Sequence, residues 1–182
     1  IGLYVVINLA YSYGLKKIAL VDAFCIASGF LLRVVAGGAA AAIEISHWLL
    51  LCTLFLALFL ALNKRRGEIT LLGDDRGKHR AILDQYTLGF LDQMVTVLAA
   101  CTIVCYTMYT VDDVTAAKFG AENRLVWSVP FVVFGIGRYM LLAQTGHKTG
   151  NPTRIFLGGD GIFALNTLAW AGVVGAVLAG AL

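Results

Sequence analysis

An arginine within an apolar stretch is the residue of this sequence that most needs a chemical explanation. Arg33 lies near the middle of the apolar stretch 20–43, and a charge at such a depth in a membrane costs at least about 2.5–3.5 kcal/mol. On a helix, Asp22, Gly29 and Arg33 fall on one face with other small residues. Arg33 is therefore expected either to bind an anion such as phosphate, which a guanidinium fork fits well, or to form a structural ion pair with an acid on another helix.

Further basic residues cluster at two places outside the apolar stretches. Lys16 and Lys17 precede the stretch that carries Arg33, and the run Lys64-Arg65-Arg66-Gly67-Glu68 follows the next one. Lys64 and Glu68 are spaced to pair across one helical turn. Basic residues at such boundaries commonly anchor membrane topology, and a charged loop is often only solvated. The alternative is that these groups, with Arg80 farther along, bind a phosphate or diphosphate and its metal ion.

The elements that would hold these residues are membrane helices. Of the 182 residues, 59% are hydrophobic and 14% are charged, whereas soluble domains are about 45–50% apolar. The apolar residues form long blocks, which predicts an all-α polytopic bundle. The net charge of +3 is modest, and we expect no nucleic-acid partner. Six transmembrane helices in one domain are predicted, at residues 1–12, 20–43, 46–63, 89–111, 125–143 and 161–182, with a kink at Pro130 in the fifth.

The loops between these helices differ in charge. The segments 13–19, 64–88 and 144–160 together hold ten basic residues, whereas 44–45 and 112–124 hold two. Because basic loops remain in the cytoplasm, the first set is predicted to be cytoplasmic in a multi-pass protein of the cell membrane. Six helices then place both ends of the chain outside. The chain begins with an isoleucine inside an apolar segment, so we expect an N-terminal truncation that removes an odd number of helices.

Several segments together resemble UbiA prenyltransferases, and most closely the branch of decaprenyl-phosphate phosphoribosyltransferases. The resemblance extends over essentially the whole chain. Two parts of the resemblance are more specific than the rest. The first combines residues Tyr11 to Lys17 with Asp22 and the segment 29–38, and the second is the run Lys64 to Glu68. Weaker parts are Arg80 with 83–87, then 91–94, and Gly150-Asn151-Pro152 before the last helix.

The resemblance implies a bundle of nine helices whose active site opens to the cytoplasm. The six helices of this chain would be the fourth to the ninth, with the first three missing. The family's aspartate-rich motif N-D-x-x-D-x-x-x-D, which would hold most ligands of a Mg²⁺ cofactor, would lie in the missing part. The fragment alone is therefore expected to be inactive, and its metal ligands are left unassigned.

The activity implied by the resemblance is transfer of 5-phosphoribose from phosphoribosyl diphosphate to a polyprenyl (decaprenyl) phosphate, for synthesis of cell-envelope arabinan precursors. Lys16 and Arg33 would contact the phosphates of the sugar donor, and Lys64, Arg65 and Arg80 would contact either phosphate group. The acids Asp22 and Glu68 would orient these bases or complete the metal site. No residue is assigned a catalytic role beyond these contacts.

Two other functions remain open at the level of sequence. The first is a UbiA-type prenyltransferase that transfers a polyprenyl group to an aromatic acceptor. The run Lys64 to Glu68 stands where such an enzyme more often has a second aspartate-rich motif. The second is a membrane transporter or structural membrane protein, in which Asp22 and Arg33 would belong to a substrate pathway. Inverted repeats typical of many transporters are not evident in the sequence.

Overall fold

The described part of the protein is a bundle of helices. The computed structural model describes residues 2–72, 81–112, 115, 124–145 and 160–180, and within these ranges all regular structure is helical. The all-α fold is thereby confirmed. The longer helices are α1 (Gly2–Tyr13), α2 (Val21–Ala41), α3 (His47–Leu72), α5 (Leu88–Val111), α7 (Val129–Thr145) and α9 (Gly161–Leu178), and the 3₁₀ turns are η1 (Leu15–Lys17), η3 (Ala81–Gln85) and η4 (Arg124–Ser128).

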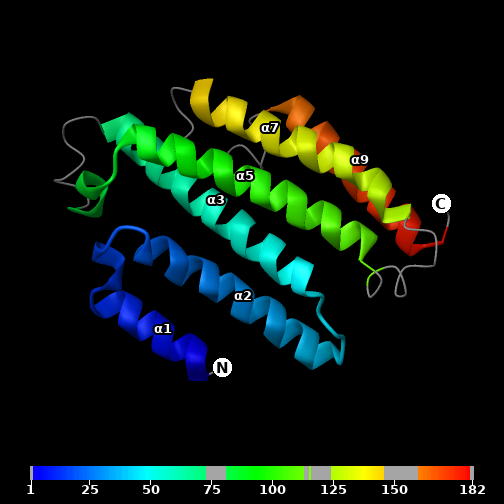
Figure 1. Ribbon diagram of the computed structural model, residues 1–182, viewed down its shortest axis with the longest axis horizontal. Coiled ribbons are helices and arrows are strands. Elements are labelled where there is room, and N and C mark those ends of the chain that lie inside the picture. The colour runs from blue at the N-terminus through cyan, green and yellow to red at the C-terminus, as the bar shows by residue number, and fades with distance from the viewer. Residues whose placement is uncertain (1, 73–80, 113–114, 116–123, 146–159, 181–182) are drawn as a thin grey trace.

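The helices pack side by side in chain order. α1 packs on α2, α2 on α3, α3 on α5, α5 on α7 and α7 on α9. Figure 1 shows α3 and α5 as the middle pair, with α1 and α2 on one side and α7 and α9 on the other. The most extensive contact joins α3 to α5, and a cluster of buried residues that includes Phe59, Leu62, Leu91 and Val95 lies between them.

Five of these helices are long and apolar enough to cross a membrane: α2, α3, α5, η4 with α7, and α9. In each of these helices, at most 33% of the residues in the apolar stretch are buried inside the bundle. Most of their apolar side chains therefore face outward, as a lipid environment requires. The chain is a multi-pass membrane protein, and α1, with 12 described residues, is the one predicted span that falls short of this length.

Two details of the predicted helices are wrong. The third helix does not end at residue 63 but continues to Leu72, because the basic run consists largely of strong helix formers and carries an ion pair one turn apart between Arg65 and Glu68. Pro130 does not kink a continuous helix. The segment divides into η4 and α7, and Pro130 lies in the first turn of α7, where a missing N–H leaves no bond unmade.

Candidate functional site

A buried ion pair joins α2 to the extended end of α3. The Nε of Arg65 donates to Oδ2 of Asp22 at 2.9 Å, and its Nη1 donates to Oε2 of Glu68 at 2.8 Å. The side chains of Arg65 and Asp22 are 3% and 0% exposed. Arg65, which the sequence suggested as a phosphate contact, therefore has two carboxylate partners inside the protein. Asp22 and Glu68 together hold the guanidinium of Arg65 in place.

The second oxygen of Asp22 is bound by a tyrosine from the segment before α5. The hydroxyl of Tyr86 donates to Oδ1 of Asp22 at 3.4 Å and accepts the backbone N–H of Leu20 at 2.6 Å. Burial raises the pKa of the Tyr86 phenol above its usual value. The hydroxyl therefore keeps its proton at neutral pH and remains a donor to Asp22.

A second ion pair ties the same end of α3 to two further helices. The Nε of Arg66 donates to Oδ1 of Asp92 in the first turns of α5, and its Nη1 donates to the carbonyl of Ala143 in α7. Together with the pair between Asp22 and Arg65, these bonds connect α2, α3, α5 and α7 at one end of the bundle.

Three exposed lysines lie at this end, which we call the basic end. Lys16 and Lys17 are on η1, just before α2, and Lys64 is on α3 next to Arg65; all three are exposed. η1 contacts η3 as well as α2. Figure 1 shows the turn between α1 and α2, the end of α3 and the start of α5 at the same side of the molecule. Arg80, the remaining predicted phosphate contact, lies outside the described residues.

Arg33 lies apart from the basic end. It shares a helix face with Asp22, but the two residues are about three turns apart, and Asp22 is bound to Arg65. The Nη2 of Arg33 donates to the hydroxyl of Tyr4 at 2.9 Å, and its guanidinium lies 5.5 Å from the ring centroids of Tyr4 and Phe30. The side chain is exposed and borders a hollow of about 400 Å³ that is otherwise lined by Tyr4, Leu32, Val35, Ala36 and Ala39.

The described acids do not fit a Mg²⁺ site. Within the described ranges, no three Asp, Glu, His or Cys side chains gather as metal ligands. Asp22 is fully buried, with one oxygen bound to Arg65 and the other to Tyr86. Glu68 also binds Arg65. Both acids thus bind protein groups in this structure, and their completing a metal site stays a prediction.

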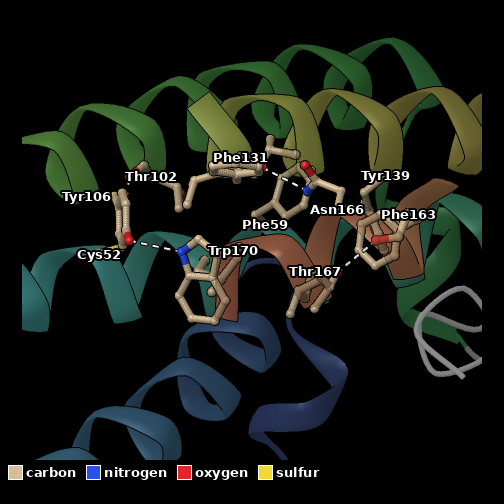
Figure 2. Close-up of a pocket in the computed structure, with 15 residues that line it drawn as sticks. Cys52, Phe59, Thr102, Tyr106, Phe131, Tyr139, Phe163, Asn166, Thr167 and Trp170 are labelled. Atoms are coloured by element: carbon tan, nitrogen blue, oxygen red, sulfur yellow. Dashed lines mark hydrogen bonds between the residues drawn. The ribbon is translucent and has the colours of Figure 1, made fainter. Parts of the chain in front are cut away.

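A separate apolar cavity of about 260 Å³ lies between α3, α5, α7 and α9. Figure 2 shows aromatic side chains around it, with Trp170 Nε1 donating to the hydroxyl of Tyr106 and Asn166 Nδ2 donating to the carbonyl of Phe131. No charged residue is among the described residues that line it. The cavity suits hydrocarbon and offers nothing to a phosphate group, so we place the candidate phosphate contacts elsewhere.

An ion pair that the sequence missed joins α7 to α9. The Nη2 of Arg138 lies 2.6 Å from Oδ2 of Asp160, and Oδ1 of Asp160 accepts the N–H of Phe163 at 2.7 Å, which caps α9. An aspartate directly before an apolar run is a helix-capping signal, and it was the clue in the sequence.

This pair predicts a pH dependence of stability. The hydrogen bond from Arg138, and then that from the Phe163 N–H, hold the pKa of Asp160 below its usual value. A carboxyl whose pKa is lowered on folding stabilises the protein above its unfolded pKa of about 3.9 and loses this effect as the pH falls through the folded pKa. We expect Asp160→Asn to lower the Tm by a constant amount between pH 5 and 8 and by less in stronger acid. A difference that grew on acidification would contradict the pair.

Comparison with known proteins identifies relatives of this chain. It is 35% identical over 183 residues to a decaprenyl-phosphate phosphoribosyltransferase of Mycolicibacterium smegmatis, covering 97% of this chain and 57% of the relative. The proteins of the same name from Corynebacterium glutamicum and Mycobacterium tuberculosis are 34% and 33% identical, over 93% and 97% of the chain and 50% and 56% of their own lengths. No model of a known protein family matches. The chain thus spans about half the length of these relatives, and the resemblance seen in its motifs is confirmed.

Proposed function

We propose, from this chain's homology to the decaprenyl-phosphate phosphoribosyltransferases, that it is part of an enzyme that transfers 5-phosphoribose from phosphoribosyl diphosphate to decaprenyl phosphate. Relatives of that name align with more than nine-tenths of the chain. The structural observation that carries the proposal is the basic end, where Lys16, Lys17 and Lys64 are exposed around a buried ion pair. The product would supply activated pentose for cell-envelope arabinan.

The reaction places a defined demand on the protein. An oxygen of the lipid phosphate attacks the anomeric carbon of the ribose, the bond from that carbon to the diphosphate oxygen breaks, and diphosphate leaves with the bonding electrons. Negative charge accumulates on the leaving group, so correctly placed cations are the most useful catalytic groups. Lys16, Lys17 and Lys64 are the exposed cations of the basic end that we assign to the phosphate groups, with Arg80 as a further contact. Arg33, about three turns along α2 from Asp22, would contact only a phosphate that reaches deeper along the helices.

Arg65 receives a different role from the one that its position in the basic run suggested. It is buried, and its Nε and Nη1 bind Asp22 and Glu68. We assign these three residues to holding α2 and α3 together, so that Lys64 and the turn before α2 keep their places. The Mg²⁺ ion expected from the resemblance would be held by carboxylates outside the described residues. It would neutralise charge on the diphosphate.

We also propose that the basic end faces the cytoplasm of the cell that carries this membrane protein. Basic segments remain on the cytoplasmic side of a membrane, and the basic end holds Lys16, Lys17, Lys64, Arg65 and Arg66. A soluble phosphoribosyl diphosphate would reach the lysines from that side. The phosphate of the lipid would lie at the same level, with its hydrocarbon along the apolar helices.

A direct assay tests this function. Membranes that contain the intact protein are incubated with labelled phosphoribosyl diphosphate and decaprenyl phosphate, and we expect a labelled lipid that does not form in membranes without the protein. A parallel incubation contains a polyprenyl diphosphate and hydroxybenzoate. Formation of prenylated hydroxybenzoate without any labelled phosphoribosyl lipid would show that the protein is an aromatic prenyltransferase instead. If neither incubation gave a product, the proposed phosphoribosyl transfer would have no support.

A further inference from the structure

We propose that Gln85 and Tyr86 are positioning residues that fix the turn carrying Lys16 and Lys17, so that both ammonium groups are held ready for the phosphates of the donor. The inference rests on the proposed function. It concerns two residues whose bonds to the turn join positions 66 or more apart in sequence and to which we assign no phosphate contact. We call the two side chains and the turn 17–20 that they bind the clamp.

Three hydrogen bonds form the clamp, and all of them go to the backbone of the turn. The Nε2 of Gln85 donates to the carbonyl of Lys17 at 2.9 Å, and its Oε1 accepts the N–H of Ala19 at 3.0 Å. The hydroxyl of Tyr86 accepts the N–H of the next residue, Leu20, at 2.6 Å. Side chains of two consecutive residues thus bind three backbone groups within four residues of the turn.

The backbone at Leu20, the last residue of the turn, is strained. Leu20 has a φ of 66° and a ψ of −42°, which residues with a side chain rarely adopt. Such a conformation costs on the order of 1–3 kcal/mol and persists only where surrounding contacts enforce it. The bond from Leu20 to Tyr86 is one such contact. The strain indicates that the turn would take another conformation without the clamp.

The clamp is anchored in the buried part of the basic end. Tyr86 is 2% exposed, and its hydroxyl also donates to Asp22, which binds Arg65. A continuous set of bonds therefore runs from the strained turn to the ion pair between α2 and α3. The side chains of Lys16 and Lys17 remain exposed, while the backbone from Lys17 to Leu20 is fixed directly after them. This is the arrangement that a binding site for a soluble anion requires.

The expected consequence of losing the clamp is weaker binding of the donor. Without the clamp, the turn that carries Lys17 would sample many conformations. Ordering it when the donor binds costs conformational entropy, which lowers the affinity for the donor. The lysines would contact phosphates that are charged both before and during the reaction. Removing the clamp should therefore raise KM for phosphoribosyl diphosphate more than it lowers kcat.

The test uses two variants of the clamp and one matched control in the intact protein. Gln85→Ala removes two of the bonds to the turn at an exposed side chain, so we expect the fold to tolerate it. Tyr86→Phe removes the bonds to Leu20 and Asp22. The control is Tyr106→Phe, which likewise removes a hydroxyl with two partners, Ser128 and Trp170, from the other part of the bundle.

Two measurements are made on each variant. The first is KM and kcat for phosphoribosyl diphosphate, where we expect KM to rise about tenfold in both clamp variants, the equivalent of roughly one hydrogen bond. The second is the rate of trypsin cleavage after Lys17 under native conditions, which reports the open population of the turn. It should rise by a similar factor in the clamp variants, and neither quantity should change in Tyr106→Phe.

The outcomes separate the clamp from the proposed function. Unchanged cleavage in Gln85→Ala would show that the turn is not held by this residue and would overturn the inference. Faster cleavage with an unchanged KM would show a clamp without a role in donor binding, which also overturns it. A wild-type protein without transfer activity would refute the proposed function and the donor assignment with it, whereas the cleavage rates would still show whether the clamp exists.

Discussion

Replacing Asp22 with alanine is expected to destabilise the protein by about 3–5 kcal/mol, because it leaves the guanidinium of Arg65 buried without its partner. Asp22 is 0% exposed and Arg65 is 3% exposed, so water cannot take the place of the lost carboxylate. Glu68 retains its bond to Arg65, which places the expected value toward the lower end of that range. The Tyr86 hydroxyl also loses its acceptor.

The measurement is thermal unfolding in detergent, followed with a fluorogenic maleimide that reacts with cysteines as they become accessible. Cys105 is buried in the folded protein and has no disulfide partner, so it reports unfolding. Asp92→Ala is the matched control, since it also deprives an arginine of an aspartate, but at a carboxylate that is 45% exposed. We expect the control to cost at most about 1 kcal/mol.

A double variant sharpens the prediction. Asp22→Leu with Arg65→Leu removes both charges, and replacing a buried ion pair by apolar side chains is often neutral or stabilising. The double variant is therefore expected to be more stable than Asp22→Ala alone. If Asp22→Ala unfolded at the same temperature as Asp92→Ala, the pair would not be held as the structure shows it.

The helices were predictable because the length of an apolar block is a local property. The blocks 20–43 and 89–111 correspond closely to α2 (Val21–Ala41) and α5 (Leu88–Val111). The end of α3 was not predictable in this way, because the hydropathy falls at the basic run although the helix continues to Leu72. A charged segment continues a helix when its charges find partners, and those partners come from other helices.

The same reason limits what could be predicted of the site. The sequence identified every residue of the ion pair between Asp22 and Arg65, but these residues are 43 positions apart and nothing local indicates that they meet. Local spacing instead suggested Lys64 for Glu68 and a shared face for Asp22 and Arg33. Gln85 and Tyr86 were noted only as part of a motif, because a clamp on the backbone leaves no charge pattern to detect.

Arg33→Ala is the second variant with a large expected effect, and it acts on activity. If Arg33 binds a phosphate of the donor, two charge-assisted hydrogen bonds are lost, and we expect transfer to fall by about a hundredfold or more. The fold should remain, because the side chain is exposed and its described contacts are the hydroxyl and ring of Tyr4 and the ring of Phe30.

Two further variants separate the anion contact from a structural role. Arg33→Lys retains the charge but loses the planar fork and the ring contacts, so it should recover part of the activity. Tyr4→Phe removes only the hydrogen bond between the hydroxyl and Nη2 and should retain most of it. The assay is phosphoribosyl transfer in membranes, with the Tm measured alongside. Wild-type turnover in Arg33→Ala would remove Arg33 from the site, and a fall in Tm in proportion to the lost activity would assign it to a structural contact between α1 and α2.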